Sequence, residues 1–245
     1  PLVLSPLAGF GVGFLIMWLI YWIFARVMRS KVNRIFRKMQ LVSAAFMATS
    51  HGLNDAQKTM GIITLTLIAV GLQPSGSGPQ LWVIAVCGLA IALGTYMGGW
   101  RVIRTLGKGL TEIATPQGFA AEASSATTIL VSSHLGFALS TTQVCSGSII
   151  GSGLGKKGGA IDWKVAARML IAWLVTFPAA GVIGAAACAV AKINVWGTLA
   201  VAAIAVVAAL IIFRLSRRNP INAMNVNEGS EVKVNAKVAT AAAAA

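Results

Sequence analysis

The chain has 245 residues, of which 57% are hydrophobic and 11% charged, and it carries a formal net charge of +14. Soluble domains contain roughly 45–50% apolar residues, so this composition excludes a soluble globular domain and predicts an all-α polytopic membrane protein. The basic residues lie in short segments between apolar runs, where they set membrane topology, and nucleic acid is not expected as a partner. The three cysteines and two histidines lack metal-ligand spacing, so no metal site is expected.

The first predicted element in chain order is a transmembrane helix within residues 1–27. The next segment, 28–39, is rich in Lys and Arg and contains no acid, so the positive-inside rule predicts a basic cytoplasmic linker. Residues 40–213 hold the following apolar runs and are predicted to form one transmembrane domain. The tail, 214–245, is polar and then alanine-rich, and it is predicted to be disordered.

The stretch 49–61, TSHGLNDAQKTMG, places ionisable and amide side chains inside an apolar run. A charged group costs about 2.5 to 3.5 kcal/mol at the centre of a bilayer, so such a cluster indicates a function. Gly52 and Asn54 are poor helix formers, and we predict a broken helix whose freed carbonyls, with Asn54 and Asp55, bind a hard cation of the sodium type. In the alternative, the helix continues and Asp55 pairs with Lys58 three residues later.

Basic segments flank residues 113–155 at both ends, so this stretch is expected to begin and end on the cytoplasmic side. It is rich in Ser, Thr and Gly and is less apolar than a lipid-facing span. We predict a re-entrant helical hairpin that is broken at 134–140, HLGFALS. The hairpin should face a cavity, because irregular backbone at membrane depth needs protein or water around it. Two full membrane crossings are the alternative.

Hydroxyl side chains gather where the second helix of this hairpin is expected to begin, at Ser140, Thr141 and Thr142. A helix N-terminus carries partial positive charge and free N–H donors, so the trio predicts an anion site, unless one hydroxyl simply caps the helix. Glu122 and Asp55 are carboxylates placed inside apolar stretches, and Glu122 is interpreted as a protonated buried acid or a proton-coupling group. Carboxylates and an anion can share a site if a proton or sodium ion binds with the anion, which indicates a symporter.

Two further patterns concern packing and chemistry. Gly147 and Gly151, like Gly94 and Gly98, have the GxxxG spacing and predict close helix packing. The residues do not form a recognisable nucleophile–base pair or metal set, so we expect no enzyme activity and no cofactor other than the coupling cation.

Three stretches carry a family resemblance: SHGLNDAQKTMG at 50–61, the run from GTYMGGW to GLGKK at 94–157, and LIAWLVTFPAAG at 170–181. They strongly resemble the inorganic phosphate transporter family in its bacterial form, and the resemblance covers about residues 1–213. Members of that family contain two inverted halves, each with an Asn-Asp motif and a Ser/Thr hairpin motif. This chain is similar to the second half alone, so the resemblance implies one half of an inverted-repeat transporter, completed by a missing N-terminal half or a second copy.

The resemblance also implies an activity and its residues. Inorganic phosphate would cross the lipid bilayer of a bacterial inner membrane by cation-coupled symport with alternating access. The family's usual ending STTH reads STTQ here, so Gln143 does not titrate. The implied roles are phosphate binding by Ser140, Thr141 and Thr142, handling of the proton or sodium ion by Asn54, Asp55 and Glu122, and support from Gly52, Gln143 and Lys58.

Two other functions are compatible with this reading of the residues. One is a non-transporting membrane half-protein or subunit that keeps half of a site. The other is a carrier of a different oxyanion such as sulfate, because hydroxyl donors would bind it in a similar way.

Overall fold

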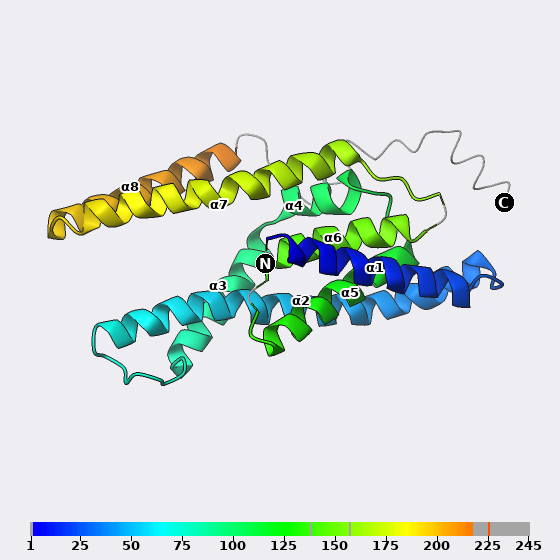
Figure 1. Ribbon diagram of the computed structural model, residues 1–245, viewed down its shortest axis with the longest axis horizontal. Helices are drawn as coiled ribbons and strands as arrows, with labels where there is room; N and C mark the ends of the chain where they lie inside the picture. The colour runs from blue at the N-terminus through cyan, green and yellow to red at the C-terminus, as the bar shows by residue number, and fades with distance from the viewer. Residues whose placement is uncertain (1, 138, 157, 218–224, 226–245) are drawn as a thin grey trace. The chain divides into compact units, whose positions relative to one another are not determined.

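The computed structural model describes residues 2–137, 139–156, 158–217 and 225 (Figure 1). The regular secondary structure in these ranges is helical, as the composition predicts. The chain divides into two compact units, the first ending at Asp162 and the second beginning at Trp163. Each unit is described by itself.

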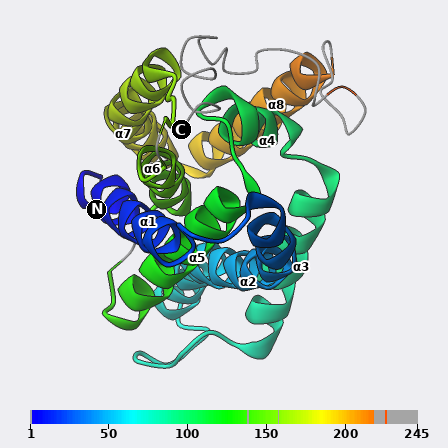
Figure 2. The ribbon, with the colours of Figure 1, turned by 90° about the vertical axis from the view of Figure 1, so that its right-hand side faces the viewer.

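The first unit is a bundle in which helices distant in sequence lie side by side (Figure 2). α1 packs along α6, α2 packs along α5, and α5 also contacts α1 and α6, while α3 packs against α2. The described helices of this unit are α1 (Leu4–Ile23), α2 (Arg29–Ala69), α3 (Leu81–Met97), α4 (Trp100–Arg104), the π-helix η1 (Thr105–Gly109), α5 (Thr115–His134) and α6 (Thr141–Leu154).

The basic segment predicted as a linker is helical from Arg29 onward and forms the first turns of α2. Its apolar anchor is Phe36, which is 2% exposed and packs in a buried cluster with Met17 and Ile20 of α1 and Ala120 of α5. Burying an aromatic side chain stabilises the folded state by about 1.5–3 kcal/mol. The packing of Phe36 therefore favours helix in a segment that its charge pattern alone predicted to be a linker.

The predicted break in α2 is wrong, because the helix runs without interruption from Arg29 to Ala69. Gly52 lies within it, and a Cβ built there would meet no atom. A glycine inside a helix costs only about 1 kcal/mol relative to alanine. The burial of Ser50 and Asn54 against neighbouring elements outweighs that cost. The described structure therefore has the alternative predicted from the sequence, a continuous helix.

A two-helix arrangement with a break is present between Thr115 and Leu154, as predicted. α5 ends at His134 and α6 begins at Thr141, so the predicted interruption at 134–140 coincides with the observed one. Gly136 has φ +75°, a left-handed conformation that glycine adopts without strain, and it reverses the chain after α5.

Glycines allow the backbones of α1 and α6 to touch. A Cβ built at Gly9 would overlap the Val144 carbonyl, and one built at Gly147 would overlap the Pro6 carbonyl. Ser148 Oγ donates to the Gly9 carbonyl at 3.2 Å, which closes the contact. The close packing predicted for Gly147 and Gly151 is therefore confirmed, since a Cβ at Gly151 would overlap the Phe10 carbonyl. The same prediction is wrong for Gly94 and Gly98, where a Cβ would meet no atom of the described residues.

The second unit consists, in its described part, of α7 (Trp163–Ala191) and α8 (Val195–Ser216), which pack against each other. Asn194 begins α8, and its Oδ1 accepts a hydrogen bond from the Gly197 amide at 2.9 Å. α7 and α8, together with α1, are long and apolar enough to cross a membrane. The predicted tail lies outside the described residues except for 214–217, whose first residues continue α8, and 225.

Candidate functional site

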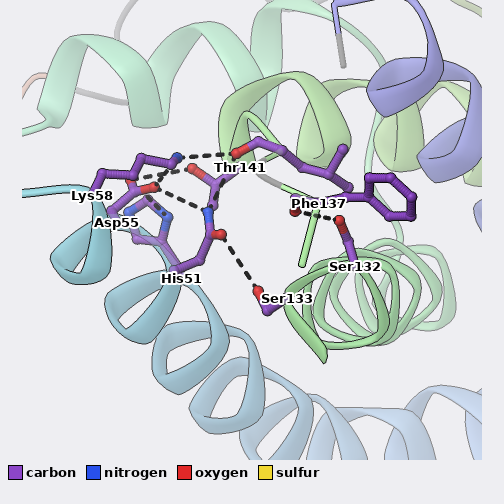
Figure 3. A network of polar contacts seen from close by, with 9 residues as sticks. His51, Asp55, Lys58, Ser132, Ser133, Phe137 and Thr141 are labelled. Atoms are coloured by element: carbon purple, nitrogen blue, oxygen red, sulfur yellow. Dashed lines mark hydrogen bonds and ion pairs between the residues drawn. The ribbon is translucent and has the colours of Figure 1, made fainter. Parts of the chain in front are cut away.

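The polar stretch of α2 faces the break between α5 and α6 (Figure 3). Thr141 Oγ1, in the first turn of α6, donates to Asp55 Oδ2 at 3.3 Å. These two residues are 86 positions apart in the sequence, and the contact brings the Asn-Asp motif and the Ser/Thr motif to one place. The site is built where a continuous helix meets an interrupted one.

Lys58 and Asn54 link the same two oxygens. Lys58 Nζ donates to Asp55 Oδ1 at 2.9 Å and to the Leu139 carbonyl at 3.0 Å. Asn54 Nδ2 also donates to Asp55 Oδ1 and to the Leu139 carbonyl, at 3.3 Å in each case. The carbonyl is free to accept because Leu139 lies between the end of α5 and the start of α6, outside either helix's hydrogen-bond ladder.

Two serines at the end of α5 support the interruption. Ser133 Oγ donates to Asn54 Oδ1 at 3.4 Å, and Ser132 Oγ donates to the Phe137 carbonyl at 2.7 Å. The first contact joins α5 to α2, whereas the second holds the turn that follows α5. Together they orient the segment that carries the Leu139 carbonyl.

The predicted phosphate trio divides into different environments. Ser140 is the N-cap residue of α6, yet its side chain makes no capping hydrogen bond, so capping does not account for it. Thr141 is 3% exposed and points to Asp55, whereas Thr142 is exposed. The trio therefore surrounds the start of α6, where the first-turn N–H groups lack helical partners, but its hydroxyls do not all point the same way.

The structure separates Glu122 from Asp55. Ser43 Oγ donates to Glu122 Oε2 at 2.5 Å, in the interface between α2 and α5. Ser43 precedes Asp55 by twelve positions on the same helix, so a rise of 1.5 Å per residue puts roughly 18 Å between them. We call Asp55 and the groups bonded around it, namely Asn54, Lys58, Thr141 and the Leu139 carbonyl, the Asp55 cluster. Glu122 contacts α2 at a different place from this cluster.

The supporting residues also separate. Gln143 lies in the first turn of α6, but it is buried, with 6% of it exposed. Gly52 has open space beside it. Of the three residues expected to support the site, Lys58 is the one that joins the Asp55 cluster.

A cavity of about 480 Å³ adjoins Asp55 on the side of α3. Residues between His51 and Ile63 on α2 and between Val86 and Thr95 on α3 line it. Asp55 is 34% exposed, so the carboxylate is accessible from this side while Thr141 holds it on the other.

Sequence reasoning missed two groups in this cluster. His51 Nδ1 lies 3.5 Å from Asp55 Oδ2, and the i,i+4 spacing on a continuous helix could have revealed it. The Leu139 carbonyl left no signal, because the type of a side chain says nothing about whether its backbone oxygen is free.

Comparison with known proteins gives a consistent result. A profile of the phosphate transporter family matches residues 25–184. The chain is 48% identical over 234 residues to a "Probable low-affinity inorganic phosphate transporter" of Mycobacterium leprae, covering 94% of this chain and 56% of that protein. A Rhizobium meliloti protein of the same name is 41% identical, with 75% and 55% covered.

Among solved structures, one titled "The sodium-dependent phosphate transporter" superposes with a TM-score of 0.54 at 22% identity, covering 72% of this chain and 53% of that one. This similarity is one of fold. The chain spans about half the length of the curated relatives that it matches.

Proposed function

The chain belongs to the phosphate transporter family, and from this premise we propose that it forms half of a cation-coupled carrier of inorganic phosphate. Family membership and three membrane-length helices make it an integral membrane protein related to transporters rather than to enzymes. The main observation behind the proposal is the hydrogen bond between Thr141 and Asp55. It brings a carboxylate that could bind a cation next to a helix N-terminus that could bind an anion.

In the proposed site, phosphate binds at the start of α6. The helix dipole and the free first-turn N–H groups attract an anion, and Ser140, Thr141 and Thr142 add hydroxyl donors around it. Ser140 Oγ is not engaged in capping, which leaves it available to a ligand. Asp55 is partly exposed and Thr142 is exposed, so both can be reached from outside the packed helices.

Asn54 and Asp55 are assigned to the positive partner of phosphate, a proton or a sodium ion. Asp55 Oδ1 and the Leu139 carbonyl lie close together, since both accept hydrogen bonds from Asn54 Nδ2, and carboxylate and carbonyl oxygens of this kind coordinate coupling ions at interrupted helices in transporters. Glu122 is assigned to the same ion at a second position, in the α2–α5 interface, where Ser43 holds it.

The helices α5 and α6 are proposed to enter and leave the membrane on one side. α6 has 14 residues, which gives a length of roughly 21 Å, shorter than the ~30 Å hydrocarbon core of a bilayer. The interruption before Thr141 would then lie inside the hydrocarbon core, beyond its midplane, where a site could open alternately to each side. The bacterial relatives favour a bacterial inner membrane.

A missing half or a second copy of the chain is proposed to complete the carrier, since the match covers only 56% and 55% of these two relatives. The test is uptake of radiolabelled phosphate into liposomes that contain the full gene product. We expect uptake, and we expect Ser140→Ala with Thr141→Ala to abolish it. Thr66→Ala with Thr176→Ala is the matched control, because both hydroxyls are exposed and bond their own helices.

Two outcomes would contradict the proposal. Absence of uptake by the wild type, even with a first half co-expressed, would favour a non-transporting subunit. Equal competition by sulfate and phosphate would favour a general oxyanion carrier.

A further inference from the structure

The ammonium group of Lys58 lies where oxygens of two different elements converge. It donates to Asp55 Oδ1 on α2 at 2.9 Å and to the Leu139 carbonyl between α5 and α6 at 3.0 Å. A surface ion pair three residues apart on a helix needs only the carboxylate. Here the same ammonium also reaches a backbone carbonyl that is 81 positions away in the sequence.

These two acceptors are of the type that binds a hard monovalent metal ion. A carboxylate and a carbonyl freed at a helix interruption would supply negative charge and a strong dipole at one point. Both oxygens already accept a bond from Asn54 Nδ2 and a second bond from Lys58 Nζ. A metal ion can contact both of them only if the ammonium leaves.

We infer that the ammonium of Lys58 fills the place of a metal coupling ion, so that the Asp55 cluster takes no sodium ion in this protein. The inference rests on the proposed function and narrows the choice of coupling ion, because it excludes sodium at the Asp55 cluster. The charge of Lys58 offsets that of Asp55, so an anion at the start of α6 is not repelled and no dissolved metal ion is required at this point. Phosphate uptake is then independent of sodium.

The position is sufficiently exposed to solvent for an ion to enter once the ammonium is removed. The side chain of Lys58 is 43% exposed and that of Asp55 is 34% exposed. Lys58→Ala opens the two oxygens to solvent, because alanine cannot reach either of them. The substitution therefore creates a sodium site from groups that are already in place.

The first experiment measures binding of sodium without any transport. The midpoint of thermal unfolding of the purified full gene product is followed as sodium chloride replaces choline chloride at constant ionic strength. We expect no sodium-specific shift for the wild type, and a saturating upward shift for Lys58→Ala, with an apparent sodium affinity at least about tenfold tighter than that of the wild type.

Four further variants make the result specific. Lys38→Ala is the matched control, a lysine exposed on the same helix, and it should respond as the wild type does. Lys58→Arg keeps the positive charge and should also show no shift. Asp55→Asn combined with Lys58→Ala should abolish the sodium response. Lys58→Gln keeps the length of the side chain and serves if the alanine variant does not fold.

The second experiment measures phosphate uptake into liposomes with sodium or choline outside. We expect equal wild-type uptake in both salts, and sodium-dependent uptake for Lys58→Ala. A sodium-specific stabilisation of the wild type equal to that of Lys58→Ala would overturn the inference, as would folded Lys58→Ala and Lys58→Gln proteins without a sodium response. If no protein transports phosphate, the proposed function fails, while the unfolding data still decide the role of Lys58.

Discussion

Asp55 of α2 and Glu122 of α5 both lie beside α2, in contrasting surroundings. Asp55 is on α2 and faces a helix interruption, where cationic and amide donors and a hydroxyl surround it. Glu122 reaches α2 from α5 and is held by Ser43 within a continuous helix–helix interface. We therefore propose that Asp55 meets a charged ligand, whereas Glu122 serves mainly the packed interface between α2 and α5.

The largest expected effect comes from Asp55→Asn. The substitution leaves the Lys58 ammonium without its carboxylate partner and weakens the link to Thr141. Loss of charge-assisted hydrogen bonds of about 2–3 kcal/mol corresponds to a fall in phosphate uptake of about 30- to 150-fold. The measurement is initial uptake into liposomes. Normal uptake with unchanged ion dependence would remove Asp55 from the site.

Glu122→Gln tests the other carboxylate and should lower coupled uptake by about tenfold, equivalent to about 1.4 kcal/mol, because an amide cannot take up or release the proton of a carboxyl group. The protein should remain folded, because an amide oxygen can still accept the hydrogen bond from Ser43. The midpoint of thermal unfolding, measured beside uptake, separates the two effects. A large loss of stability with normal uptake would make Glu122 a structural residue.

Gly9→Ala tests how strongly the Asp55 cluster depends on the close packing of α6 against α1. A Cβ at Gly9 would overlap the Val144 carbonyl of α6, and such overpacking costs about 1–3 kcal/mol. Gly11→Ala is the matched control on the same helix, because a Cβ there meets no atom. We expect Gly9→Ala to lower both the unfolding midpoint and uptake, and Gly11→Ala to lower neither.

If Gly9→Ala shifts α6, the Asp55–Thr141 hydrogen bond should weaken more than the Ser43–Glu122 hydrogen bond, because Thr141 belongs to α6 whereas the second bond joins α2 to α5. Uptake lowered to the same extent by Gly11→Ala would contradict this explanation.

The comparison of the two carboxylates also shows what the sequence could predict. Residue type and flanking charge were sufficient for the helical membrane class, for the helix–break–helix at 113–155 and for the start of the second helix near Ser140. The break predicted at residues 49–61 is wrong, because local propensity disfavours helix by only about 1 kcal/mol at Gly52, and tertiary contacts of that size decide the outcome.

Three features could be found only from the structure. The pairing of Glu122 with Ser43 depends on which faces of α2 and α5 meet, and neither residue type encodes that choice. The Leu139 carbonyl is part of the site because it lies in the non-helical segment between α5 and α6. Residue type does not reveal which backbone oxygens lie outside a helix. Burial of Phe36, which converts a basic linker into helix, likewise follows from packing with α1 and α5.

The smallest expected effects come from the adjacent serines that support the Asp55 side of the comparison. Ser133 Oγ donates across to Asn54 at 3.4 Å, a long and weak bond, whereas Ser132 Oγ donates to the Phe137 carbonyl at 2.7 Å and is 8% exposed. Ser132→Ala should therefore cost about 1 kcal/mol of unfolding free energy, and Ser133→Ala clearly less. Uptake should respond in the same order, because the turn positions the Leu139 carbonyl, and a reversed order would mean that the bridge to α2 supports the site more than the turn does.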